Sequence, residues 1–181
     1  MNRQKIHIRP ITPDDTASVV AWRNKDFVRK NFIYQKPFTK EGHLTWLREQ
    51  VEPGHVAQFI ICLEDGTSIG SVYLRDIDRE KKTAEYGVFI GEEKALSQGY
   101  GTQAARLMLA YGFGTLGLKK IFLRFLEDNV GAQKSYEKAG FRMIQDRRES
   151  VCLEQGTRGV LFMETERSAW ENAISPGMEK A

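Results

Sequence analysis

The sequence is short of the residues that build disulfide frameworks and metal sites. Only two of its 181 residues are cysteine and three are histidine. Cys62 and Cys152 lie far apart in apolar stretches, where cysteine usually acts as a small buried residue, so we expect no disulfide. His7, His43 and His55 form no pair four residues apart and have no cysteine at ligand spacing. We therefore predict no bound metal.

Long hydrophobic runs are also missing. No segment approaches the ~20 consecutive apolar residues that a membrane-spanning helix needs. Residues 1–10 contain no continuous apolar stretch of signal-peptide length. We expect a cytoplasmic protein that has no membrane partner.

The chain lacks a strong excess of charge of one sign. It carries 27 basic and 24 acidic residues, which give a formal net charge of +3. The basic residues are scattered, with only doublets such as Lys81 with Lys82 and Arg147 with Arg148. Proteins that bind nucleic acid usually concentrate such residues on one face. We therefore expect solvated surface charge and no nucleic-acid partner.

What the chain does have fits one globular domain. Its length and its 41% hydrophobic content suffice for one substantial core, and no repeat, low-complexity block or linker divides it. We predict a single domain over residues 1–170 and a C-terminal tail over residues 171–181. Apolar periodicity, turn signals and helix caps predict the elements. Strands are expected at residues 5–11, 57–63, 68–74, 83–90, 120–126, 142–153 and 158–166, and helices at residues 13–22, 40–52, 102–111 and 129–139.

The stretch "SQGYGTQA", residues 97–104, places Gly99 and Gly101 directly before a helical pattern. Glycine costs roughly 0.5–1 kcal/mol relative to alanine in regular structure, so the pair indicates a need for bare backbone. A helix start offers unpaired N–H groups and the positive end of the helix dipole, which together bind anions. We predict a phosphate site, with a tight loop that requires positive φ as the alternative.

Two other phosphate motifs fit this stretch less well. "GYGTQA" matches the dinucleotide pattern G-x-G-x-x-A, but residues 91–98 separate it from the preceding strand. The chain also ends in strands, with no second nucleotide-binding half. A P-loop is excluded because no Gly-Lys-Ser/Thr follows the glycines.

A second motif, "EDNVGAQKSYEKAGF", completes a resemblance to the GNAT superfamily of acetyl-CoA-dependent N-acetyltransferases over residues 6–166. Gly99, Tyr100 and Gly101 match the glycines of that family's Q/R-x-x-G-x-G/A loop, and Asn129 and Tyr136 match a later pair seven residues apart. The resemblance implies an α+β, three-layer fold. Its sheet would be twisted, mixed and mostly antiparallel, with about seven strands, helices on both faces and a splayed cofactor cleft.

The resemblance also implies the cofactor contacts. Amides of the glycine loop hold the CoA pyrophosphate, and strand residues pair with the pantetheine arm. Leu96 departs from the pattern because the family has Gln or Arg there, so Gln98 or backbone alone must serve. The predicted cofactor-binding residues are Val88, Phe89, Ile90, Gln98, Gly99, Tyr100, Gly101, Thr102 and Asn129.

Tyr136 is the predicted general acid. The thiolate leaving group, with a reference thiol pKa near ~8.5, benefits from a proton donor, and a phenol of pKa ~10 keeps its proton at pH 7. The alternative is a core anchor, since Ala132, Tyr136 and Ala139 share one helix face.

Glu85 is the predicted base. Many members of the family place a carboxylate on the strand before the pyrophosphate loop, where it acts through water. Some place a glutamate five residues before the asparagine instead, but this chain has Arg124 there. Glu127 and His43 are reserve candidates, and the alternative for Glu85 is a solvent-facing carboxylate at a strand end.

The segment between the first two helices is predicted to bind the acceptor. It is rich in aromatic rings, which stack on sugars or bases, and in arginines, which hold phosphates. The alternative is a lid whose aromatic side chains fill the core. The predicted substrate-binding residues are Trp22, Arg23, Asn24 and Arg29.

The same segment resembles the branch that acetylates nucleotide-linked amino sugars, and it is similar to ribosomal-protein and polyamine acetyltransferases. We predict acetyl transfer from acetyl-CoA to the primary amine of a small molecule, with an amino-sugar nucleotide as the leading acceptor. Alternatives are protein N-terminal or polyamine acetylation, or a sensor that binds acyl-CoA without turnover. Members of the family often pair, so the resemblance allows a homodimer.

Overall fold

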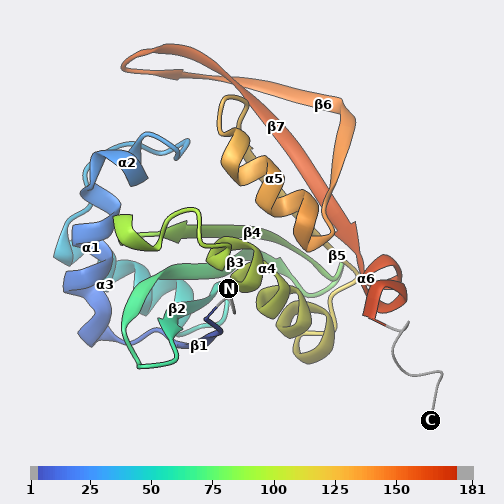
Figure 1. Cartoon of the computed structure of the whole chain (residues 1–181), viewed down its shortest axis with the longest axis horizontal. Coiled ribbons are helices and arrows are strands. Elements are labelled where there is room, and N and C mark those ends of the chain that lie inside the picture. Colours follow the sequence, from blue (N-terminus) through green and yellow to red (C-terminus); the bar gives the residue numbers. More distant parts are fainter. Residues whose placement is uncertain (1–3, 175–181) are drawn as a thin grey trace.

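The computed structural model describes residues 4–174, which fold around one sheet of seven strands (Figure 1). The strand order is β1-β2-β3-β4-β5-β7-β6, and every neighbouring pair is antiparallel except β4 with β5. This confirms the predicted mixed, mostly antiparallel sheet. The strands are β1 (Ile6–Pro10), β2 (Ala57–Leu63), β3 (Ser68–Asp78), β4 (Thr83–Ile90), β5 (Lys120–Leu126), β6 (Arg142–Leu153) and β7 (Gly156–Glu166).

Helices cover both faces of the sheet, as expected. Trp22 of α1 packs against Phe89 of β4, whereas Tyr136 of α5 packs against Tyr86 of the same strand. Residues 86 and 89 point to opposite faces because side chains alternate along a strand. The helices are α1 (Thr16–Asn24), α2 (Asp26–Arg29), α3 (Lys40–Trp46), α4 (Tyr100–Ala110), α5 (Val130–Ala139) and α6 (Arg167–Ile174).

Local capping residues mark the helix ends. Thr12 and Asp15 form a capping box before α1, and the Thr39 hydroxyl accepts a hydrogen bond from the Gly42 amide at 3.1 Å. Gly140 ends α5 in the left-handed conformation, with φ of 106°. Two short helices were not predicted. The first is α2, and the second is α6, which takes in residues 171–174 of the predicted tail; residues 175–181 lie outside the described part.

The main core lies between the sheet and α4. Apolar side chains of the central strands pack there against Ala104, Met108 and Phe113, all of which are fully buried. A smaller cluster beneath α1 contains Val19 and Trp22. These two layers fix the central strands from both sides.

The two parallel strands stay together for only three residues. Thr83–Glu85 of β4 pairs with residues 120–122 of β5, and beyond that point neither strand pairs with the other. Both strands continue, β4 to Ile90 and β5 to Leu126, so they diverge. This is the predicted splayed cleft.

Within residues 4–174, no helix is long and apolar enough to cross a membrane. The same part of the chain contains no group of three or more His, Cys, Asp or Glu side chains arranged to hold a metal ion.

The close approach of β3 to β4 generates a test of the fold. A Cβ atom at Gly70 would lie 2.2 Å from the main-chain oxygen of Phe89, and a backbone atom cannot step aside as a side chain can. We expect Gly70→Ala to lower the free energy of unfolding by about 1–3 kcal/mol in urea titration. Gly114→Ala is the control, because a Cβ atom at Gly114 would have nothing within 4 Å. This variant should leave the free energy of unfolding unchanged. Equal stability of the two variants would contradict this packing.

Candidate functional site

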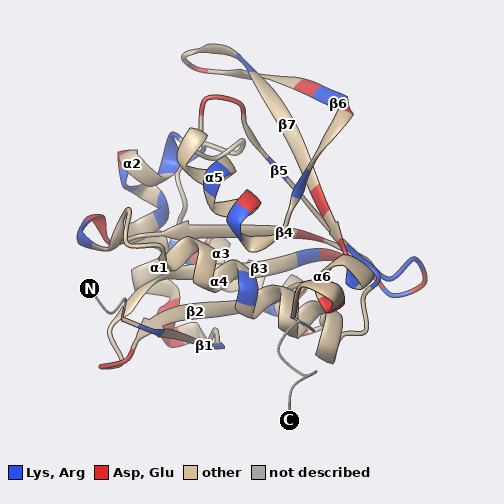
Figure 2. Ribbon diagram, turned by 45° about the vertical axis from the view of Figure 1, so that its right-hand side comes forward, with Lys and Arg blue, Asp and Glu red and all other residues tan. Residues whose placement is uncertain are grey.

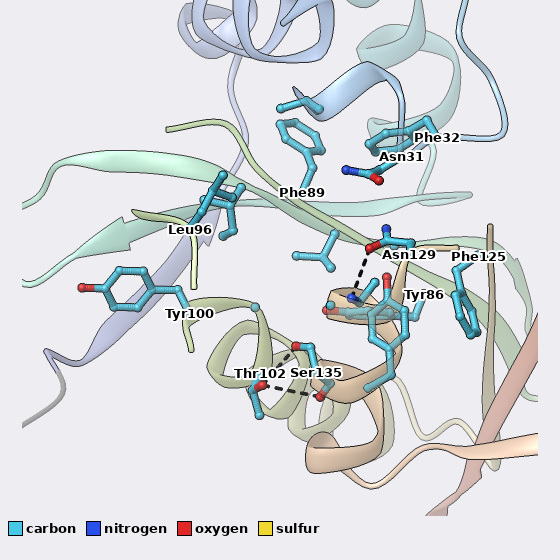
Figure 3. A pocket seen from close by; sticks show the side chains of 18 of the residues that line it. Asn31, Phe32, Tyr86, Phe89, Leu96, Tyr100, Thr102, Phe125, Asn129 and Ser135 are labelled. Carbon is cyan, nitrogen blue, oxygen red and sulfur yellow. Dashed lines mark hydrogen bonds between the residues drawn. The ribbon is translucent and has the colours of Figure 1, made fainter. Parts of the chain in front are cut away.

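A cavity of about 770 Å³ occupies the gap where β4 and β5 diverge. Its walls come from both strands, from the starts of α4 and α5, and from α2 with the loop that follows it. Figure 3 shows Asn31, Phe32 and Phe89 on one side of this cavity and Asn129, Thr102 and Ser135 on the other. The cavity therefore brings together segments that are about a hundred residues apart in the sequence.

The start of α4 forms one end of the cavity. Ser97 and Gly99 both have left-handed backbones, with φ of 60° and 83°, and they turn the chain tightly into the helix. The N–H groups of the first helical residues, Tyr100 to Thr102, have no acceptor within the helix. The positive φ of Gly99 fits the tight-loop alternative, and the helix start presents the free amides that the predicted phosphate site requires.

Gly101 allows α4 and α5 to approach each other closely. A Cβ atom there would lie 3.2 Å from the Ser135 hydroxyl, which is itself 3.0 Å from the Thr102 hydroxyl (Figure 3). Three basic residues of these two helices also line the cavity: Arg106, Lys134 and Lys138. This end therefore combines free amides with positive charge, which suits a phosphorylated ligand.

The edge of β4 forms the wall next to the helix starts. Residues 87–90 pair with β3 on one side, but their other side faces the gap instead of β5. Backbone N–H and C=O groups on that side are left for an extended ligand. Val88, Phe89 and Ile90 all line the cavity, where the predicted pantetheine contacts require them.

The Tyr136 side chain packs between β4 and β5. Its ring makes edge contacts with Tyr86 of β4 at 6.0 Å and with Phe125 of β5 at 5.7 Å between centroids. The residue lines the cavity although it is only 8% exposed. Burial, and secondarily the nearby Tyr73 phenol, raise the pKa of Tyr136 above its usual value. The phenol therefore holds its proton throughout the physiological pH range.

Glu85 lies at the point where the strands separate, held by two arginines. Its Oε1 accepts a hydrogen bond from Arg75 Nη2 at 2.7 Å and from Arg124 Nε at 2.9 Å. The Glu85 side chain is only 9% exposed, so the alternative of a solvent-facing carboxylate is wrong. Oε2 has no hydrogen-bond partner among the described residues and remains available to a ligand or water.

Tyr73 lies beside this group and closes the sheet surface over Gly87. A Cβ atom at Gly87 would lie 2.3 Å from the Tyr73 ring. Gly87 is thus required for the ring to lie flat across β4. Burial raises the pKa of Tyr73, with opposing effects from Arg75 and Arg23, so this phenol is also neutral at pH 7.

Asn129 has a structural role in addition to its place in the cavity wall. Its side-chain oxygen accepts a hydrogen bond from the Ala132 amide at 3.2 Å, which caps α5 (Figure 3). The cap fixes the start of the helix that carries Tyr136. The seven-residue spacing predicted to be functional thus joins the cap of α5 to the side chain that faces the gap.

The structure brings nearly all of the predicted catalytic and cofactor residues to one cavity, but not Gln98. Gln98 precedes Gly99 in the loop and lies outside the cavity lining. Leu96, which stands where the family has Gln or Arg, does line the cavity (Figure 3). The predicted residues that line the cavity are Glu85, Val88, Phe89, Ile90, Gly99, Tyr100, Gly101, Thr102, Asn129 and Tyr136.

None of the predicted substrate residues lines the cavity. Trp22 is buried and donates to Glu92 at 2.5 Å, and Asn24 braces the backbone of Phe38 through two hydrogen bonds. Arg29 pairs with Asp26 on the exposed side of α2. The contacts of these three residues fit the alternative, in which this segment packs as a lid over the core.

Arg23 is buried among aromatic rings in the cavity wall. Its guanidinium carbon lies 3.3 Å from the Phe32 ring centroid and 4.4 Å from that of Phe38. It forms no ion pair with any described carboxylate, and its Nη1 is buried without a hydrogen-bond partner. Burial lowers the pKa of Arg23 to about 10, so the side chain is still charged at pH 7.

Sequence reasoning missed several cavity residues. Tyr73 lies on the predicted strand 68–74 and Arg75 just beyond its predicted end, although β3 extends to Asp78, and Arg124 enters the sequence argument only as the residue in place of a glutamate. Their positions opposite Gly87 and Glu85 depend on strand register, which no local motif reveals. The four-residue spacing of Lys134 and Lys138 on α5 is a further signal for the phosphate end, besides the glycine pair.

Comparisons with known proteins agree with this geometry. A family model described as acetyltransferase (GNAT) domain matches residues 5–142. An uncharacterized protein of Methanocaldococcus jannaschii is 31% identical over 152 residues, which are 82% of this chain and 30% of that protein. The chain thus spans about a third of that relative. Spermidine N(1)-acetyltransferase of Escherichia coli is 28% identical over 75% of this chain and 72% of its own length.

Solved structures show the same fold. Spermidine N-acetyltransferase from Vibrio cholerae, in complex with CoA and spermine, superposes with a TM-score of 0.84 at 19% identity. The match covers 92% of this chain and 98% of that one. A dodecameric structure of the same enzyme matches with a TM-score of 0.80 at 19% identity, over 94% and 98% of the two chains. These likenesses support the α+β architecture predicted from the sequence.

The start of α4 generates a test of the phosphate site. Alanine at a left-handed position costs roughly 1–2 kcal/mol, and relieving that strain at Gly99 would move the free amides. We expect Gly99→Ala to weaken the binding of CoA, the predicted cofactor, at least about tenfold, as measured by calorimetry. A loss of this size corresponds to one charge-assisted hydrogen bond. Gly140→Ala is the matched control, because φ there is 106° but the residue lies outside the cavity lining. Equal losses of CoA affinity would contradict the assignment.

Proposed function

The chain belongs to the acetyltransferase (GNAT) domain family, and we propose that it transfers the acetyl group of acetyl-CoA to the primary amine of a small molecule by direct attack. The observation that carries this proposal is the gap between β4 and β5, with free helix amides at one end and a buried phenol inside it. The family match supports an acetyl-CoA-dependent N-acetyltransferase, as predicted.

The residues present fit acetyl-CoA. Amides at the start of α4, together with Arg106, Lys134 and Lys138, would hold its phosphates. The free edge of Val88 to Ile90 would pair with the pantetheine arm, which has amide groups of its own. When bound, acetyl-CoA supplies an activated thioester whose carbonyl carbon accepts the amine.

Tyr136 is the proposed general acid. The amine nitrogen forms a bond to the carbonyl carbon, the carbon–sulfur bond breaks, and the phenol donates its proton to the departing sulfur. Burial raises the pKa of Tyr136 and also disfavours a free thiolate in the gap. The phenol can therefore still transfer its proton to the departing sulfur. The nitrogen, which carries one proton too many after it attacks, releases that proton to solvent, and the phenolate regains a proton from solvent.

Glu85 is the proposed base. An acceptor amine near pKa ~10.4 must lose a proton before it attacks. The two arginines fix Glu85 through Oε1, and the unbonded Oε2 would take that proton through a water molecule. Arg75 and Arg124 position this carboxylate and do not act on the reacting atoms.

The acceptor remains the open part of the proposal. Two of the named relatives are spermidine acetyltransferases, and they support the polyamine alternative better than the predicted amino-sugar-nucleotide branch. A thiol-release screen across spermidine, an amino-sugar nucleotide and a peptide with a free N-terminus compares these acceptors directly. A sensor without turnover would show thermal stabilisation by acetyl-CoA and no thiol release with any amine.

Replacing the proposed acid tests the mechanism. Tyr136→Phe retains the ring and its contacts with Tyr86 and Phe125, so we expect unchanged stability and CoA affinity. Loss of a general acid lowers rates typically by about 10²–10⁴, and we expect kcat to fall at least about 100-fold. Tyr111→Phe, which removes a hydroxyl outside the cavity lining, should leave kcat unchanged. An unaltered kcat in Tyr136→Phe would remove this residue from the mechanism.

The pH dependence of the reaction is a separate test. The active form of Tyr136 is protonated, and its raised pKa moves loss of that proton above the ordinary phenol value of ~10. We expect kcat/KM to rise with pH as the amine, near pKa ~10.4, deprotonates, with no descending limb up to about pH 10. A descending limb below pH 9 in the wild type that disappears in Tyr136→Phe would contradict the raised pKa.

A further inference from the structure

We propose that the acceptor amine carries an oxyanion, a carboxylate or a phosphate, which Arg75 and Arg124 bind beside the reacting centre. This inference rests on the proposed acetyltransferase function and specifies the chemical class of its acceptor. It follows from the side chains on the face of the sheet opposite to Tyr136.

Strand alternation divides the cavity into two faces. Glu85, Gly87 and Phe89 of β4 point toward α1, whereas Tyr86 and Val88 point toward the face where α5 carries Tyr136. The phosphate-binding helix starts lie on the Tyr136 side. A ligand held there delivers its thioester into the gap, so the attacking amine comes from the other face.

The register of β3 brings Arg75 to the acceptor face. Arg75 pairs with Glu85 across the two strands, and Tyr73 pairs with Gly87. Arg124 of β5 reaches the same carboxylate from the other side of the gap. Basic residues on β5 and α5 are visible around the gap in Figure 2.

Charges on the cavity wall are almost all positive. Glu85 is the single carboxylate that lines the cavity within residues 4–174, and both arginines already neutralise it. The other charged lining residues, Arg106, Lys134 and Lys138, belong to the phosphate end. The acceptor face is therefore left with a net positive charge.

The arginines keep donors free for a ligand. Arg124 uses only Nε for Glu85, and its two terminal nitrogens have no hydrogen-bond acceptor among the described residues. Arg75 donates through Nη2, and its ion pair to the largely exposed Asp76 is longer, at 3.6 Å. Guanidinium groups with free terminal N–H groups bind carboxylates and phosphates in matched geometry.

Arg23 adds to the positive potential from behind the wall. It is only 5% exposed, stacks against Phe32, and has no carboxylate partner in the described part of the chain. Phe32 lines the cavity, so this charge lies one ring away from it. A polyamine would bring several positive charges to this surface, whereas an oxyanion would compensate them.

Matched acceptors test the inference on the wild-type protein. One pair is 4-aminobutyrate against 1,4-diaminobutane, and the other is phosphoethanolamine against ethanolamine, with spermidine as the polyamine. We expect kcat/KM to be at least about tenfold higher for the oxyanion member of one or both pairs, at constant low ionic strength, since salt screens charge contacts. The two pairs separate carboxylate from phosphate.

Arginine variants locate the contact. We expect Arg124→Gln and Arg75→Gln to lower kcat/KM for the preferred oxyanion acceptor about tenfold or more relative to its uncharged or cationic counterpart. Arg167→Gln is the matched control, because Arg167 also donates Nε to a glutamate, at 2.8 Å, but far from the cavity. If either variant misfolds, Arg124→Lys retains the positive charge, and the same acceptors are compared on that variant.

The outcomes separate this inference from the function on which it rests. Equal or better turnover of 1,4-diaminobutane, ethanolamine or spermidine overturns the inference and leaves the acetyltransferase intact. Absence of thiol release with every amine overturns the proposed function. In that case calorimetry on the CoA-bound protein decides, since tighter binding of 4-aminobutyrate than of 1,4-diaminobutane supports the oxyanion site and the reverse order refutes it.

Discussion

The separation of β4 from β5 is the constraint on which the rest of the site depends. Strands in a sheet normally stay paired, because unpaired backbone groups lose hydrogen bonds. Here Tyr136 packs between Tyr86 and Phe125 on one face, while Glu85 and Arg124 bridge the strands at the last paired position on the other. The Tyr136 ring and the ion pair between Glu85 and Arg124 thus determine where the pairing of β4 with β5 stops. Both also belong to the proposed chemistry, so geometry and reaction share the same residues.

Burial of Glu85 is tolerated because its two partners act together. A carboxylate in a largely enclosed position costs several kcal/mol unless it is paired and hydrogen-bonded. Arg75 and Arg124 come from strands on either side of β4, so the carboxylate ties three strands together. Removing one arginine would leave the other charges imperfectly matched. The arginines are therefore fixed parts of the acceptor face and cannot vary independently of the base.

Much of this arrangement follows from local sequence, and the remainder follows from register. The cap at Thr39 and the left-handed glycine at 99 are short-range features that local sequence indicates, whereas the cap that Asn129 provides was not predicted. The burial of Glu85 could not be inferred, since its partners are 10 and 39 residues away and meet it only across strands. Arg23 is predicted to bind substrate because arginine can hold phosphates, yet stacking on Phe32 places it inside the wall.

Fold and acceptor chemistry are set by different residues in this chain. The proposed cofactor end would use backbone amides, a free strand edge and a phenol, and these features depend on topology more than on side-chain identity. The acceptor face depends on which charges project from β3, β4 and β5. Relatives at 28% identity can therefore share the cofactor end while differing in the acceptor face. Under the proposed function, a position such as Arg124, where a carboxylate would reverse the local charge, would select which amine enters the gap.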